Sequence, residues 1–272
     1  MSKQIKEFLK YLLVIFLLLI FLFPLYYLFV KSHYSNSFET NNIVSFSPDT
    51  FDFYNYKQAL NTNFLPALGL SISSLVLVLL IRLFIFILAA IALNKLPKVI
   101  VKFILIFLLI ISLIPDVVLF LPLKKVLIET NLINKSLAFS LITNSIFSYF
   151  IFLNIFKTFE EIKEKQKETI QIDNIGFRHQ VLYVYLPKLR MPLFLLVIFS
   201  TLNVWNDYLW PLFILSGYKL DTIGIWFRFL GDTGFSNLEN VQSAGAIIAL
   251  SIPLSIYLIF SPFINKIISK NS

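Results

Sequence analysis

Residues 11–30 read YLLVIFLLLIFLFPLYYLFV, and no charged side chain interrupts this stretch between Lys10 and Lys31. A helix needs about 20 mostly apolar residues to cross the roughly 30 Å hydrocarbon core of a bilayer. The run is continuous rather than alternating, which favours a spanning helix over a strand of a β-barrel. Basic residues precede it as in a signal peptide, but it is long and lacks a small-x-small cleavage site, so we expect an uncleaved membrane anchor.

The rest of the chain has the same character. Of 272 residues, 58% are hydrophobic and only 14% are charged, whereas a soluble domain carries about 25% charged residues. A water-soluble fold of this length could not bury so much apolar surface. We therefore expect an all-α integral membrane protein, a single transmembrane domain over residues 1–272, with six transmembrane helices at about 11–30, 66–93, 99–123, 136–156, 192–215 and 243–264.

The basic residues predict the orientation, because segments on the cytoplasmic side of a membrane are enriched in lysine and arginine. With the N-terminus inside, fifteen lysines and arginines fall on inner segments, seven on outer segments and Arg82 within a span. We therefore expect both termini in the cytoplasm and a multi-pass protein of the cell (plasma) membrane. The net charge of +8 follows from this topology and from contact with anionic lipid, and it does not indicate nucleic acid.

A long inner polar segment lies at about 157–190 and reads, from Phe159, FEEIKEKQKETIQIDNIGFRHQVLYVYLPKLRMP. Its first half is charged and compatible with a helix. Asp173, Asn174 and Gly176 are turn residues, since asparagine and glycine best tolerate positive φ. Beyond the turn, apolar residues recur at helical spacing: Val181, Val184 and Tyr185. We expect a helix–turn–helix at the cytoplasmic face, and the apolar stripe predicts that it docks a partner.

This segment resembles the EAA loop of permease subunits in ABC importers, whose pattern is E-A-A-x-x-D-G-A followed by an apolar position and x-L-P. The matching positions are Glu168, Thr169 and Ile170 for E-A-A, Asp173, Asn174 and Ile175 for D-G-A, and Leu186 and Pro187 for L-P. Asn174 for glycine is a mild change, because asparagine also adopts a left-handed turn. Thr169 and Ile170 in place of two alanines add bulk where the helix would pack into a partner's groove.

Further segments are similar, in the same order, to carbohydrate-type permeases, and most of all to the second permease subunit of maltose-type transporters. They lie at residues 48–56, 114–116, 121–123, 131–134, 203–212 and 243–246. The resemblance implies a permease subunit of a binding-protein-dependent ABC importer. Such a subunit forms the pathway for a sugar or a related polyol or glycerol phosphate, and couples transport to ATP hydrolysis.

The same resemblance implies three kinds of partner: cytoplasmic ABC ATPase subunits, a second homologous permease in a heterodimer, and an extracytoplasmic solute-binding protein. The chain has no G-x-x-x-x-G-K-[ST] motif that could cradle nucleotide phosphates. We therefore expect no enzyme activity and no cofactor on this chain, with ATP and Mg²⁺ on the ATPase. His33 and His179 are far apart without a ligand cluster, so we expect no metal site. The alternative is a secondary transporter driven by an ion gradient, although the sequence has no convincing internal repeat.

Polar residues inside the predicted spans form the candidate substrate path. Asn206 and Asp207 offer hydrogen-bond acceptors for hydroxyl groups, and Trp205 and Trp210 offer flat faces on which a sugar can stack. In the structural interpretation, the polar pair instead fixes a helix break before Pro211 and the tryptophans pack between helices. Arg82 is the other intramembrane charge, and three interpretations stay open: an ion pair with Asp207, snorkelling, and a role at the seam between two permeases.

Overall fold

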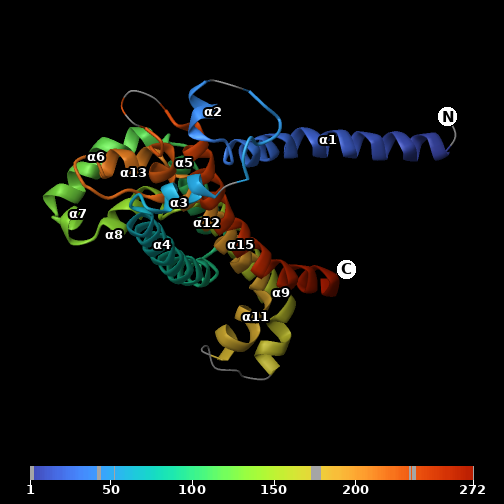
Figure 1. The fold of residues 1–272 in the computed structure, drawn as a ribbon. Coiled ribbons are helices and arrows are strands. Elements are labelled where there is room, and N and C mark those ends of the chain that lie inside the picture. Colours follow the sequence, from blue (N-terminus) through green and yellow to red (C-terminus); the bar gives the residue numbers. More distant parts are fainter. Residues whose placement is uncertain are drawn as a thin grey trace. The chain divides into compact units, whose positions relative to one another are not determined.

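The computed structural model describes residues 3–41, 44–51, 53–172, 179–232, 234 and 237–271, and it is drawn in Figure 1. These described residues are almost entirely helical, and their one β-type contact is an isolated bridge between Asp232 and Asn237. The chain divides into two compact units, Met1–Leu65 with Ile223–Ile252, and Pro66–Thr222 with Pro253–Ser272. The single domain over residues 1–272 stays a prediction.

The first unit contains a long apolar helix and several short ones. It holds α1 (Lys3–Lys31), α2 (Asn36–Thr40), α3 (Tyr54–Leu60), α14 (Ile223–Arg228) and the first part of α15 (Glu239–Asn271). The spanning part of α1 is apolar all round, and only 6% of it is buried (Figure 1, blue). A helix that is hydrophobic on every face belongs in a membrane, since water would be in contact with each apolar side chain.

The second unit holds most of the helices. They are α4 (Phe64–Leu93), α5 (Lys98–Ser112), α6 (Asp116–Glu129), α7 (Leu132–Lys135), α8 (Leu137–Ile142), the 3₁₀ turn η1 (Thr143–Ser145), α9 (Tyr149–Ile172), the π-helix η2 (Gln180–Tyr185), α11 (Leu186–Lys188), α12 (Arg190–Asn206), α13 (Leu209–Ile214) and the end of α15. The first two residues of α4 precede Pro66, where this unit begins. Its main core joins α4, α9, η2 and α12, with Phe86, Phe152, Ile155 and Leu196 at the centre.

The described residues contain three unbroken helices that are long and apolar enough to span a membrane: Gln4–Lys31, Phe64–Leu93 and Glu239–Ile259. Two bent pairs raise the number to as many as five, Lys98–Ser112 with Asp116–Glu129 at 91° and Leu137–Ser145 with Tyr149–Lys165 at 72°. The predicted third span at 99–123 is therefore not one straight helix. The chain bends where Leu113 and Ile114 precede Pro115, because the residue before a proline is disfavoured in the α conformation.

The predicted fifth span at 192–215 is also broken, since α12 ends at Asn206 and the short α13 follows. The six-helix count and the cytoplasmic location of both termini stay predictions.

Candidate functional site

The break between α12 and α13 is built from Asp207 and Pro211. Asp207 has extended backbone angles, φ −71° and ψ 119°, directly after the last residue of α12. Its carboxylate accepts a hydrogen bond from the backbone N–H of Trp210, one of the N–H groups that the start of a helix leaves without an acceptor. Pro211, the third residue of α13, needs no acceptor there because it has no N–H.

The two tryptophans beside this break are buried. Trp205 is 8% exposed and Trp210 is fully enclosed. The Trp210 indole N–H donates to the Ser140 carbonyl at 3.0 Å, and its ring lies 5.0 Å from the Phe120 ring. Neither tryptophan is among the residues that line the neighbouring cavity. The Trp210 ring therefore packs between helices, and a role of the two tryptophans in the substrate path stays a prediction.

Asn206 and Asp207 do reach a cavity, of about 680 Å³, next to the break. Its polar lining comes from four separate stretches of chain: Arg82; Asp116; Asn144, Ser145 and Ser148; and Asn203, Asn206, Asp207 and Tyr208. Apolar side chains complete the wall, among them Val117, Phe120, Phe147 and Leu202. The cavity thus presents amides, hydroxyls and two carboxylates beside aromatic surface.

Sequence reasoning singled out Asn206 and Asp207 but not the other asparagines of this cavity. Asn203 lies one helical turn before Asn206, so its position on the same face was readable from the spacing. Asn144 comes from η1, and no sequence signal connects it to α12. Its side-chain oxygen is buried without a hydrogen-bond partner among the described residues.

Arg82 is fully buried in α4 and is bound by backbone rather than by a carboxylate. Its Nε donates to the Ile146 carbonyl at 3.2 Å, one terminal nitrogen donates to the Ser200 hydroxyl at 2.6 Å, and the other donates to the Ser145 carbonyl. In the part of the chain that the structure describes, Arg82 forms no ion pair with Asp207, although both line the cavity. The carbonyls of residues 145 and 146 lie at the bend before α9, where helical acceptors are lost. The snorkelling interpretation is wrong, because the side chain is 1% exposed.

A family comparison identifies the kind of protein to which these helices belong. Residues 83–271 match the binding-protein-dependent transport system inner membrane component family. The chain belongs to this family. It is a multi-pass inner membrane protein and the permease component of a binding-protein-dependent ABC importer, not an enzyme. This confirms the resemblance found in the sequence, and the secondary-transporter alternative is set aside.

Individual relatives agree with this assignment. The permease is 27% identical, over 89% of its length and 80% of the relative's, to a probable ABC transporter permease protein of Mycoplasma genitalium. It is 26% identical, over 97% of its length and 96% of the relative's, to the sn-glycerol-3-phosphate transport system permease protein of Rhizobium meliloti. A solved bacterial ABC transporter involved in the import of the acidic polysaccharide alginate has the same fold, with a TM-score of 0.71 and 20% identity over 98% of both chains.

The EAA-like loop of the permease is described in part. Glu168, Thr169 and Ile170 continue the backbone of α9, although their side chains are not described, and Leu186 and Pro187 begin α11. Asp173, Asn174 and Gly176 lie outside the described residues. The predicted turn therefore cannot be compared with the structure, whereas the predicted first helix is the end of α9.

The apolar stripe of this loop packs within the permease itself. Tyr185 is 5% exposed, and its ring stacks on Phe159 of α9 with 4.0 Å between centroids and 10° between planes. Val181 and Val184 pack against the same core cluster. Burial also raises the pKa of the Tyr185 phenol. Tyr185 is thus covered by α9, whereas Val181 and Val184 are only partly buried, and the prediction that the loop docks a partner stays a prediction.

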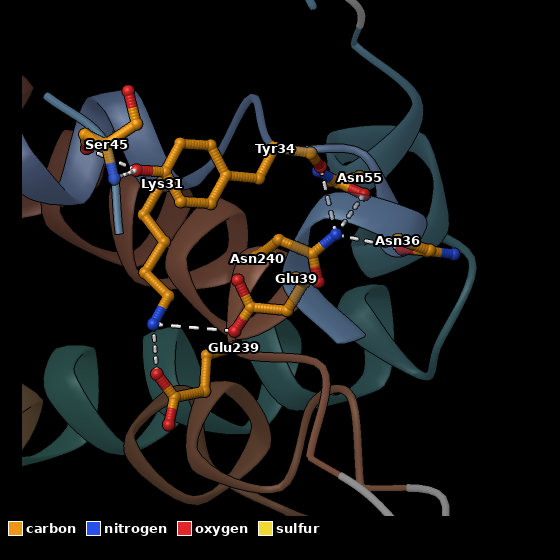
Figure 2. A network of polar contacts seen from close by, with 8 residues as sticks. All are labelled: Lys31, Tyr34, Asn36, Glu39, Ser45, Asn55, Glu239 and Asn240. Atoms are coloured by element: carbon orange, nitrogen blue, oxygen red, sulfur yellow. Dashed lines mark hydrogen bonds and ion pairs between the residues drawn. The ribbon is translucent and has the colours of Figure 1, made fainter. Parts of the chain in front are cut away.

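The first unit contains a polar network between the segment after α1 and the start of α15 (Figure 2). The Asn240 amide donates to the Tyr34 carbonyl at 3.0 Å and contacts the side-chain oxygens of Asn36 and Asn55 at 2.8 and 3.3 Å. Lys31 forms ion pairs with Glu39, at 3.4 Å, and with Glu239. Apart from the Lys31–Glu39 pair, these contacts join residues about 200 positions apart, and no pattern in the sequence relates them.

Proposed function

We propose that the permease lines the translocation pathway for a sugar or a related polyol or glycerol phosphate, together with a second, homologous permease subunit. The cavity at the α12–α13 break carries this proposal. Backbone that leaves the helical conformation at membrane depth is tolerated where it borders a cavity or is buried in protein, and transporters place their substrate sites at such broken helices. The name of the Rhizobium meliloti relative supports a substrate of the glycerol phosphate type.

The chemistry of the cavity supports a hydroxyl-rich substrate. Its volume of about 680 Å³ is within the usual 300–1,000 Å³ of small-molecule sites. Each asparagine supplies both a donor and an acceptor, and each carboxylate accepts from hydroxyl groups. Phe120 and Phe147 border the same space and can cover the apolar C–H faces of a sugar ring. Asn203, Asn206 and Asp207 are the residues of α12 and its end that would contact the substrate.

Energy would enter through the EAA-like loop. In this proposal, Glu168, Thr169, Ile170, Asp173, Asn174, Gly176, Leu186 and Pro187 contact a separate cytoplasmic ATPase, which holds ATP and Mg²⁺. The stack of Tyr185 on Phe159 fixes the far side of the loop to α9. Movement of the ATPase would then pass to α9 and rock the spans as a rigid body. An extracytoplasmic binding protein would deliver the substrate.

Uptake by the reconstituted complex tests the pathway. We expect Asn206→Ala and Asp207→Asn to lower ATP-dependent uptake into vesicles about tenfold or more, since each removes a group of the cavity wall whose hydrogen bond to the substrate is worth about 1–3 kcal/mol. Ser112→Ala, an exposed hydroxyl on α5 bonded only within its own helix, is the matched control. Unchanged rate and substrate preference in both cavity variants would refute the proposed pathway.

Coupling is tested by separate variants of the loop. We expect Gly176→Val and Asp173→Lys to uncouple ATP hydrolysis from uptake while membrane insertion stays intact. The measurement is the ATPase rate of the complex with and without the substrate-loaded binding protein. Stimulation of the ATPase equal to that of the unmodified complex would show that these residues do not transmit the signal.

A further inference from the structure

A second cavity, of about 660 Å³, lies between α5 and α9 and is separate from the cavity at the α12–α13 break. Its lining comes from the end of α4 and the α4–α5 connection (Leu93, Asn94 and Leu96), from one face of α5 (Lys98, Val101, Lys102, Leu105 and Ile106) and from one face of α9 (Tyr149, Phe156, Lys157, Glu160, Lys163 and Glu164). We refer to it as the α5–α9 groove. Neither the substrate path nor the EAA-like positions contribute to it.

The groove has a charged end and an apolar end. Lys98, at the start of α5, pairs with Glu164, late in α9, at 3.8 Å, so the two helices run in opposite directions along the groove. Four lysines lie toward this end: Lys98, Lys102, Lys157 and Lys163. Beyond them the lining is Leu105, Ile106, Tyr149 and Phe156. The side chains therefore change from ammonium groups to apolar surface along the groove.

The charged end has an excess of positive charge. Two carboxylates face the four lysines: Glu164 pairs with Lys98, and Glu160 pairs with Lys157 at 3.1 Å. Lys163 donates to the backbone carbonyl of Asn94, just past the end of α4. Lys102 forms no ion pair with any residue that the structure describes. Two ammonium groups are thus left without a counter-ion at one end of an apolar groove.

The charged end also lies at the boundary of the hydrophobic helices. The spanning helix α4 ends at Leu93, and α5 begins at Lys98. Ile106 comes eight residues after Lys98, which places it about 12 Å further along α5 at 1.5 Å per residue. The groove therefore extends from a membrane surface into the hydrocarbon region, a depth that a soluble protein domain does not reach but an acyl chain occupies.

We propose that the α5–α9 groove binds an anionic phospholipid. Its phosphodiester lies among Lys98, Lys102, Lys157 and Lys163, and an acyl chain follows the apolar lining toward Leu105 and Ile106. Basic pockets between spanning helices on the cytoplasmic side attract anionic head groups in this way, and the distribution of basic residues predicts that this end of the permease is cytoplasmic. The two glutamates match a singly charged phosphodiester better than a multiply charged phosphate.

The test is lipid binding by the full-length permease, purified with its partner subunits and titrated with phosphatidylglycerol or with zwitterionic phosphatidylcholine. Lys102→Gln removes the lysine without a counter-ion, and Leu105→Trp fills the apolar half while every charge stays in place. The matched controls are Lys125→Gln, which removes an exposed lysine of α6, and Ile110→Trp, which enlarges an exposed position of α5 outside the groove.

We expect Lys102→Gln to weaken phosphatidylglycerol binding about fivefold, the equivalent of about 1 kcal/mol per lysine near an anionic head group, and to lower the preference over phosphatidylcholine by the same factor. Leu105→Trp should reduce binding of both lipids, and the two controls should bind as the unmodified protein does. Three results would overturn the proposal. The first is unchanged lipid binding in both groove variants. The second, loss of lipid binding only in Lys102→Gln with full competition by inorganic phosphate, would assign a free-anion site. The third, loss of the ATPase subunit from the Leu105→Trp complex with lipid binding intact, would assign a protein contact.

Discussion

The close approach of α14 and the following turn to α15 yields a quantitative prediction at Gly245. A Cβ atom added to Gly245 would lie 2.1 Å from Cδ1 of Leu230 and 3.5 Å from the Trp226 ring. Leu230 is 4% exposed and cannot swing into open space. Gly245→Ala therefore forces a buried leucine from its position, at a cost of about 1–3 kcal/mol for overpacking.

Helix propensity acts in the opposite direction. Alanine in place of glycine within a helix stabilises it by about 0.5–1 kcal/mol, because glycine loses more backbone freedom on folding. We therefore expect Gly245→Ala to lower the free energy of unfolding by a net amount of up to about 2.5 kcal/mol. Leu230→Ala removes the clashing atoms. In a protein that already carries Leu230→Ala, Gly245→Ala should therefore stabilise the fold by about 0.5–1 kcal/mol.

The assay is equilibrium unfolding of the full chain in mixed micelles, followed by far-ultraviolet circular dichroism, for the four members of this double-mutant cycle. The coupling free energy between positions 230 and 245 should be about 1–3 kcal/mol. Gly69→Ala is the matched control, because a Cβ there meets nothing within 4 Å and should stabilise α4 in any background. If Gly245→Ala has the same effect with Leu230 or Ala at position 230, the proposed contact does not limit the packing of α15.

Three further predictions concern single residues. Arg82→Met should destabilise the protein by about 2 kcal/mol or more, because it removes the donor of three hydrogen bonds at about 0.6 kcal/mol or more for each bond within a membrane. Arg82→Lys should recover only part, and equal stability of all three proteins in thermal unfolding would contradict this. Asn240→Ala removes the amide that donates to Tyr34 and Asn36. In vesicles that expose the segment after α1 to added protease, this variant should speed cleavage of that segment, whereas the control Asn237→Ala should not. Burial raises the pKa of Asp221, so the folded state holds the proton more tightly and stability is lost as pH rises through the carboxylate range. Asp221→Asn should abolish this loss, and in pH-dependent unfolding it should be the more stable protein at pH 7. A pH profile that the substitution leaves unchanged would show that Asp221 does not cause the loss of stability.

The position of the apolar helices could be predicted from the sequence, but their breaks could not. The predicted span at 11–30 lies within α1, and 66–93 lies within α4, because uninterrupted apolar runs leave one physical solution in a membrane. Hydropathy also made 99–123 one run, although Pro115 divides it. A hydropathy average counts proline by its polarity and ignores its effect on the backbone of the residue before it.

The candidate site was predictable where its residues share one helix. Asn206 and Asp207 stand out because polar residues are rare in spans. Asp116 and Asn144 come to the same cavity from α6 and η1, and only the packing of helices in space brings them there. The partners of Arg82 could not be predicted for a different reason: two of them are backbone carbonyls, which every residue carries, so no residue type marks them.

The three hydrogen bonds of Arg82 also restrict how the permease can move. They tie α4 to the bend before α9 and, through Ser200, to α12, and these elements carry much of the polar wall of the cavity. The wall cannot widen locally without breaking these charge-assisted hydrogen bonds. A transport cycle that preserves these bonds must turn the wall as one piece toward each side of the membrane in succession. The substrate would then meet the same arrangement of amides and carboxylates on entry and on release. Its affinity for the pathway would change through the contacts that the second permease subunit makes.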